Sequence, residues 1–70
     1  MYRFLVVIER CGETYSAYSP DLPGCVATGE TREEVERNIH EAIRMHVQGL
    51  REDNLPIPKA ESIAEYIAVH

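Results

Sequence analysis

The sequence predicts a small α+β domain of order β-β-β-α-β, with one helix packed on a small, mostly antiparallel sheet. Two observations carry this prediction. The N-terminal part holds three short β-favouring runs separated by turn residues, and a last run at residues 62–69 alternates again. Between them, residues 32–52 repeat apolar side chains at helical spacing. Because the chain has only 70 residues, we expect a single domain over residues 1–70.

The first strand is expected over residues 2–9, where every even position is apolar. The odd positions place Leu5 and Val7 between charged residues, so the second face of this strand is partly apolar as well. Residues 10–13 include a glycine and supply a turn. Residues 14–19 are rich in Thr, Tyr and Ser, and we expect them to form the return strand.

A rigid corner is predicted at residues 20–25, because two prolines and a glycine in this stretch exclude regular structure. The residues assigned to this structural turn are Pro20, Pro23, Gly24 and Cys25. Cys25 is expected to be a small buried side chain at the start of a third strand over residues 25–28. Asp21 is the corner residue that structure alone explains least, although an aspartate can also cap a turn through its own backbone.

The helix is expected to begin after Thr31 and to run to about Glu52. Thr31 is a favourable N-cap residue, and Glu34 three positions later completes a capping box. The apolar stripe comprises Val35, Ile39, Ala42, Ile43, His46, Val47 and Leu50. Gly49 inside the helix costs about 1 kcal/mol relative to alanine, which indicates close packing at that position.

The charge of the chain limits its partners. Seven basic residues against twelve acidic ones give a formal net charge of −5 at pH 7, so we expect no direct binding to nucleic acid. The longest apolar run covers residues 4–8, far short of the ~20 residues of a membrane span. We therefore expect a cytoplasmic protein without membrane contact.

Neither a disulfide nor a metal site is expected. Cys11 and Cys25 lie at opposite ends of the second predicted strand, about 20 Å apart at ~3.3 Å per residue, and a disulfide needs Cα atoms within about 7 Å. The sequence also contains no CxxC or HExxH motif. Glu13 and Asp21 are candidate acids, but they too lie at opposite ends of one strand. We therefore expect no catalytic residue, no metal and no cofactor.

One helix covers only one face of the predicted sheet, so the face that carries Leu5 and Val7 is expected to mediate self-association, as a dimer or a higher oligomer, or to bind a partner. The candidate partner-binding residues are Tyr15, Tyr18, Asp21 and Leu22. The two tyrosines point to opposite faces, so one should be in the core and the other available to a partner.

Several motifs together resemble one family. They are residues 15–25 (Tyr-Ser-Ala-Tyr-Ser-Pro-Asp-Leu-Pro-Gly-Cys), residues 28–31 (Thr-Gly-Glu-Thr), Glu33, Glu34 and Asn38, and residues 54–58 (Asn-Leu-Pro-Ile-Pro). This pattern resembles the HicB family, the antitoxins of HicA–HicB toxin–antitoxin systems. The resemblance implies a partly degenerate ribonuclease-H-like fold and a protein that binds and blocks HicA, a small basic RNA-cleaving toxin. An acidic chain suits such a partner electrostatically.

The chain differs from typical HicB proteins in length. Those proteins carry a C-terminal DNA-binding domain, whereas about eighteen residues follow the predicted helix here. We therefore expect a short form without DNA binding or autoregulation. The leading hypothesis is a non-catalytic HicB-like antitoxin. The alternative is an orphan homo-oligomeric interaction module that has no toxin partner.

Overall fold

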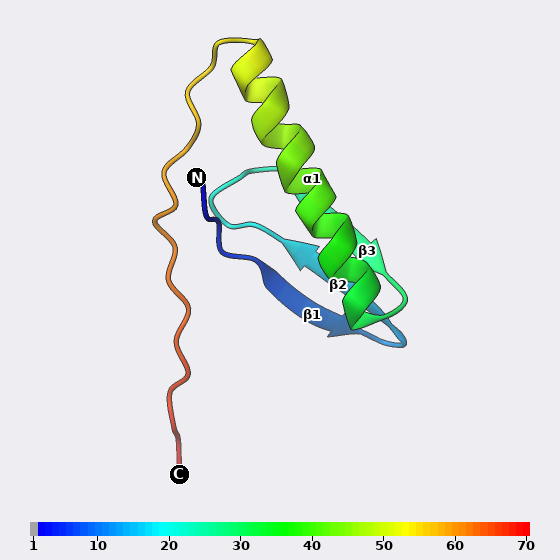
Figure 1. Cartoon of the computed structure of the whole chain (residues 1–70). Coiled ribbons are helices and arrows are strands. Elements are labelled where there is room, and N and C mark those ends of the chain that lie inside the picture. Colours follow the sequence, from blue (N-terminus) through cyan, green and yellow to red (C-terminus); the bar gives the residue numbers. More distant parts are fainter. Residues whose placement is uncertain (1) are drawn as a thin grey trace.

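The computed structural model describes residues 2–70. Within them the chain forms a three-stranded antiparallel sheet followed by one helix, which confirms the α+β class and the order β-β-β-α (Figure 1). The elements are β1 (Val7–Cys11), β2 (Thr14–Tyr18), β3 (Val26–Gly29) and α1 (Arg32–Glu52). The strands lie in the order β1-β2-β3, so β2 is central.

Strand β1 begins five residues later than the sequence predicted and extends to Cys11. Its first pair is Val7 with Tyr18, the last residue of β2. The ladder cannot continue far beyond this pair, because Pro20 has no backbone N–H to donate. Residues 2–6 therefore run extended beside the corner without belonging to the sheet. The loop between β1 and β2 shortens to Gly12 and Glu13, with Gly12 at a φ of 64°.

One face of the sheet forms the core together with the helix. Ile8 pairs with Ala17, and Ala17 pairs with Ala27, so these three side chains point to the same side. Helix α1 lies across this face, chiefly over β3 and β2 (Figure 1). The buried core comprises Ala17, Leu22, Cys25, Val35 and Ile39.

Helix α1 begins as its cap residue predicts. The backbone N–H of Glu34 donates to Oγ1 of Thr31 at 3.1 Å, which satisfies one of the free donors of the first turn. Among the described residues, the return bond from the Glu34 side chain to the backbone of Thr31 is not formed, so only half of the predicted capping box is present.

The helix ends in a Schellman motif at Asn54. This residue adopts a φ of 56°, a left-handed conformation that asparagine tolerates well. Its N–H donates to Arg51 O at 3.1 Å, and the N–H of Leu55 donates to Leu50 O at 2.9 Å. The reversal turns the chain back along the molecule, toward the N-terminal segment (Figure 1).

Two glycines show where the helix and the sheet touch. A Cβ atom added to Gly29 would lie 2.6 Å from the backbone N of Val35, so only glycine allows β3 to approach α1 this closely. Asn38 adds a second tie, because its side-chain amide donates to Thr28 O at 2.8 Å. The close packing that the sequence suggested at Gly49 is wrong, since none of the described residues outside its own helical surroundings comes within 4 Å of a Cβ there.

The last predicted strand is also wrong. Residues 62–69 are extended, but within residues 2–70 they pair with no strand. Their side chains alternate as in a strand. A strand is stable only when it pairs with the edge of a sheet, and an alternating sequence does not guarantee that such an edge is available. The segment instead leaves the domain as a single extended chain, which is the orange-to-red end in Figure 1.

Candidate functional site

The corner between β2 and β3 is closed by its own backbone. The N–H of Leu22 donates to Ser19 O at 3.1 Å, and the N–H of Cys25 donates to Leu22 O at 3.1 Å. The N–H of Ser19 in turn donates to Cys25 O at 3.2 Å. Gly24 completes the reversal at a φ of 81°, which favours glycine. These three bonds give the corner a defined shape without help from a ligand or partner.

Leu22 is the side chain by which the corner enters the core. It is fully buried, with 0 % of its surface exposed, next to Val35 and Ile39 of the helix. Its assignment as a partner-binding residue needs correction, because a leucine at this depth contacts only the protein's own core. Cys25 is also buried, and this burial raises the pKa of its thiol by desolvation of the charged form.

Ser19 ties the corner to the N-terminal segment. Its hydroxyl donates to Leu5 O at 2.9 Å, and the residue is only 3 % exposed. The bond satisfies a buried hydroxyl and holds the segment before β1 where the ladder has ended. Sequence analysis assigned Ser19 only to the end of a strand, because no local pattern shows that a serine bonds a residue fourteen positions earlier.

Asp21 ties the corner to the C-terminal segment. Its Oδ1 accepts a hydrogen bond from the Ser62 hydroxyl at 2.9 Å, and its Oδ2 accepts one from the Ser62 N–H at 3.1 Å. The carboxylate is half-buried and acts as a two-point clamp on the returning chain. Asp21, which the sequence pattern left unexplained, therefore has a structural role. Its partner Ser62 could not be identified from the sequence, because the two residues are 41 positions apart.

The helix-free face of the sheet carries an apolar row. Val7 pairs with Tyr18, and Tyr18 pairs with Val26, so these three side chains project together on the side opposite the core. Val26 is 66 % exposed and Tyr18 is 39 % exposed, whereas Val7 and the preceding Leu5 are half-buried. We call Val7, Tyr18 and Val26 the outer row.

The pairing also separates the two candidate tyrosines. Tyr18 lies in the outer row, whereas Tyr15 pairs with Arg10 and Gly29 on the opposite side and packs against the core. The sequence placed one tyrosine in the core and one on the surface without saying which. The register assigns them: Tyr15 is the packing residue and Tyr18 the exposed one.

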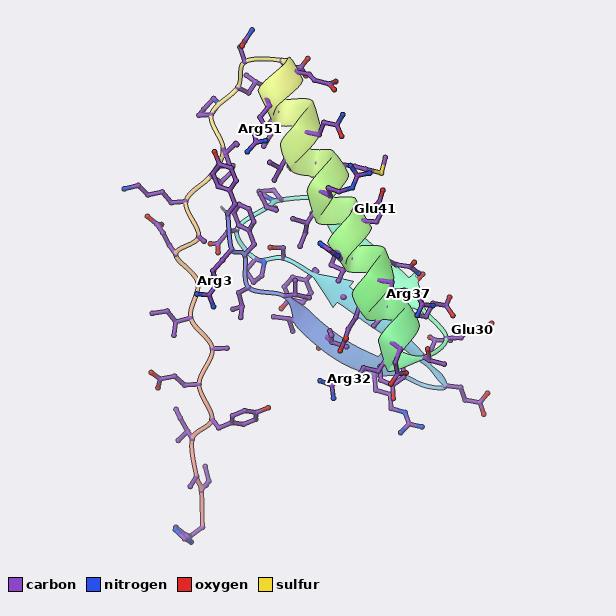
Figure 2. All side chains as sticks on the ribbon, viewed as in Figure 1. Arg3, Glu30, Arg32, Arg37, Glu41 and Arg51 are labelled. Atoms are coloured by element: carbon purple, nitrogen blue, oxygen red, sulfur yellow. The ribbon has the colours of Figure 1, made fainter. Side chains whose placement is uncertain are left out.

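The exposed side of α1 is charged and largely self-paired. Arg32 pairs with Glu36 at 3.1 Å, and Arg44 donates to Glu41 at 3.0 Å from Nε. The hydrogen bond from Arg44 lowers the pKa of Glu41. Figure 2 shows Arg32 and Glu41 on the outside of the molecule, and both pairs are exposed, where ion pairs contribute little to stability. The helix therefore presents mixed charge, in contrast to the apolar outer row.

Three further properties concern the described residues as a whole. Within residues 2–70, no three His, Cys, Asp or Glu side chains come together in a group suited to a metal ion. In the same part of the chain, no helix is long and apolar enough to cross a membrane. Cys11 and Cys25 are free thiols there, the first exposed and the second buried.

The sequence of this chain is similar to that of a known protein family. Residues 4–70 match the sequence model described as "HicB_like antitoxin of bacterial toxin-antitoxin system". The chain is 38 % identical over 69 residues to a UPF0150 protein of Thermoplasma acidophilum, covering 97 % of each chain. It is 33 % identical over 70 residues to a UPF0150 protein of Synechocystis, covering 99 % of this chain and 89 % of the relative.

A phage relative is longer. The chain is 39 % identical over 62 residues to an uncharacterized 14.9 kDa protein of Haemophilus phage HP1. That match covers 89 % of this chain but only 47 % of the phage protein, so the chain spans about half the length of this relative. No solved structure matches the chain.

Proposed function

Because the chain belongs to the family of HicB-like antitoxins of bacterial toxin–antitoxin systems, we propose that it binds and neutralises a small, basic HicA-type RNA-cleaving toxin. It acts by occupying the toxin's surface and catalyses no reaction itself. Residues 1–70 form the single domain that does this, and they need no cofactor and no contact with nucleic acid. Since such a toxin cuts RNA, the site of action is the cytoplasm.

The outer row carries this proposal. Tyr18 and Val26 are exposed apolar side chains at the end of the sheet next to the corner, and tyrosine is a residue type enriched in protein interfaces. A sheet face held by two ladders needs little reorganisation to bind, which favours affinity. The outer row is therefore the surface to which the toxin docks.

Charge selects the occupant. Glu9 follows Val7 by two positions and so lies on the same face, next to the outer row. The chain as a whole carries a net charge of −5, so a basic protein is attracted to it over a distance of several ångströms before contact. We therefore assign the outer row to the toxin.

The proposal is tested by co-expressing this chain with the small basic protein encoded beside its gene. Wild-type chain should rescue growth and co-purify with that protein. Val26→Asp and Tyr18→Ala should each weaken the complex by roughly 30-fold or more in Kd, equivalent to ~2 kcal/mol at a central interface residue. Met45→Asp, on the exposed side of α1, is the matched control and should leave binding unchanged.

Two results would contradict this function. A complex that survives both outer-row substitutions would show that the toxin docks elsewhere. If no basic protein binds and the wild-type chain self-associates through Leu5, Val7 and Tyr18, the chain is an orphan homo-oligomeric module instead. Nuclease activity of the purified chain with Mg²⁺, lost in Asp21→Ala, would overturn the non-catalytic assignment.

A further inference from the structure

One edge of the sheet is incomplete. Within residues 2–70, β1 pairs with β2 on one side and with no strand on the other. Because α1 lies chiefly over β3 and β2, the core-facing side chains of the β1 region are only partly covered. Phe4, Val6 and Ile8 are half-buried for this reason, although they pack against the core cluster.

An apolar groove follows this edge. It has a volume of about 330 Å³ and lies between the N-terminal segment with β1 and the side of the helix. Its lining includes Phe4, Val6, Ile8, Ile39, His40 and Ile43. A strand added beside β1 would direct alternate side chains into this groove and would satisfy the free backbone groups of the edge. At the other edge of the sheet, β3 is the strand that α1 packs against most closely, so among residues 2–70 no comparable apolar groove follows it.

The chain also contains an unused strand. Residues 63–69 are extended, and in the described part of the chain they pair with nothing. Their large apolar side chains are the most exposed ones in residues 2–70: Ile63 at 83 %, Tyr66 at 107 %, Ile67 at 80 % and Val69 at 87 %. Such a row of exposed apolar side chains is typical of a surface that another molecule covers.

We propose that residues 63–69 add as a fourth strand to the β1 edge of a second copy of this chain, with the side chains of Ile63, Ile67 and Val69 on the side of its groove. In this arrangement the unpaired apolar segment of one copy covers the unpaired edge and the apolar groove of the other. When two copies exchange these segments reciprocally, both edges and both grooves are filled, which gives a closed twofold dimer.

The geometry directs the segment to another copy. The two hydrogen bonds between Ser62 and Asp21 fix where the segment leaves the domain. Beyond that point its side chains make almost no contact with their own domain, and Figure 1 shows the red end of the chain diverging from β1. The longest dimension of the molecule is 47 Å against 28 and 19 Å for the others, because the segment projects from it.

This dimer uses a surface different from the outer row. The groove lies on the helix side of the sheet, whereas Tyr18 and Val26 project from the opposite side. Exchange of the segment therefore leaves the outer row open to a toxin. The inference also holds if no toxin exists, so its test is independent of the proposed function.

The test uses the full chain. Light scattering should give twice the 8.0 kDa of one chain for the wild-type protein. The double variant Ile63→Asp, Ile67→Asp should run at the mass of one chain, keep the helical circular dichroism signal and lose part of the strand signal, because β1–β3 and α1 do not depend on the segment. Ala64→Asp, on the opposite side of the same strand, is the charge-matched control and should remain a dimer.

A labelled mixture decides which copy holds the strand. Equal amounts of ¹³C-labelled and unlabelled chain should show NOEs between the methyl groups of Ile63 or Ile67 in one copy and Phe4 or Ile8 in the other. Wild-type chain at the mass of one chain would overturn the proposal, with intramolecular NOEs assigning the strand to its own sheet. A dimer that survives the double aspartate substitution would also overturn it.

Discussion

Asp21 and Ser62 are 41 positions apart in sequence, yet two hydrogen bonds join them, at 2.9 Å to the serine hydroxyl and 3.1 Å to its backbone N–H. The aspartate belongs to the Pro-Asp-Leu-Pro-Gly-Cys corner, and the serine belongs to the segment that returns after the helix. Local geometry at the corner does not need a carboxylate at this position. The aspartate is therefore explained by the segment it holds.

Loss of this clamp should be measurable. Asp21→Ala removes an acceptor used twice and should lower the free energy of unfolding by about 1.5–3 kcal/mol, the range for hydrogen bonds to charged groups. Ser62→Ala should cost less, since the backbone bond remains, and the double variant should cost no more than Asp21→Ala. Urea unfolding measures these values, and Glu30→Ala in an exposed loop is the control (Figure 2). Additive effects of the two substitutions would contradict the clamp.

Two glycines should respond oppositely to the same substitution. Gly29→Ala places a methyl group 2.6 Å from the backbone of Val35, which cannot move away as a side chain could, so we expect a loss of about 1–3 kcal/mol. Gly49→Ala meets open space within a helix and should stabilise the protein by roughly 0.5–1 kcal/mol. Thermal melting of both variants makes the comparison. A stabilised Gly29→Ala variant would show that β3 and α1 are farther apart than the structure places them.

Leu22→Ala tests the role of the corner in the core. Because Leu22 is fully buried, the truncation should lower the free energy of unfolding by about 2–5 kcal/mol. Met45→Ala removes a side chain of similar size that is 60 % exposed, and should change stability by less than about 0.5 kcal/mol. Urea denaturation at one pH compares the two. A Leu22→Ala variant as stable as Met45→Ala would return Leu22 to the surface that the sequence assigned it.

The buried thiol should make stability depend on alkaline pH. Burial raises the pKa of Cys25 above its ordinary value of 9.0, so the unfolded chain loses this proton first as the pH increases. The contribution of the protonated Cys25 thiol to the free energy of unfolding is therefore fully present below pH 9. Above pH 9 it falls, by at most about 1.4 kcal/mol per pH unit for one proton. Cys25→Ala should show a shallower decline across that range. Equal slopes for both proteins would contradict this assignment.

The helix was predictable because its signals are local. Thr31 caps it, its apolar stripe repeats every turn, and its bounds at Arg32 and Glu52 agree with the sequence pattern. The three strands before the helix were predictable in order but not in extent, and the strand predicted after the helix does not pair within the described residues. The start of β1 depends on where Tyr18 ends the neighbouring strand and Pro20 follows it. The apolar residues at 2–9 carry no information about that pairing.

The candidate site divides in the same way. The corner and the burial of Cys25 follow from prolines, a glycine and a small apolar side chain close together in sequence. The outer row of Val7, Tyr18 and Val26 requires the register of two ladders, which alternation alone leaves undetermined. Residues 62–69 have the pattern of a strand, but pairing depends on an edge elsewhere, so the pattern could not decide it.

The position of Ser62 has a mechanical consequence. Tension applied to the C-terminal segment reaches the domain through the Asp21 carboxylate and passes to the backbone of the corner. From there Ser19 transmits it to Leu5, just before β1. A pull on this segment therefore acts on the corner and on the start of the sheet before it acts on the helix.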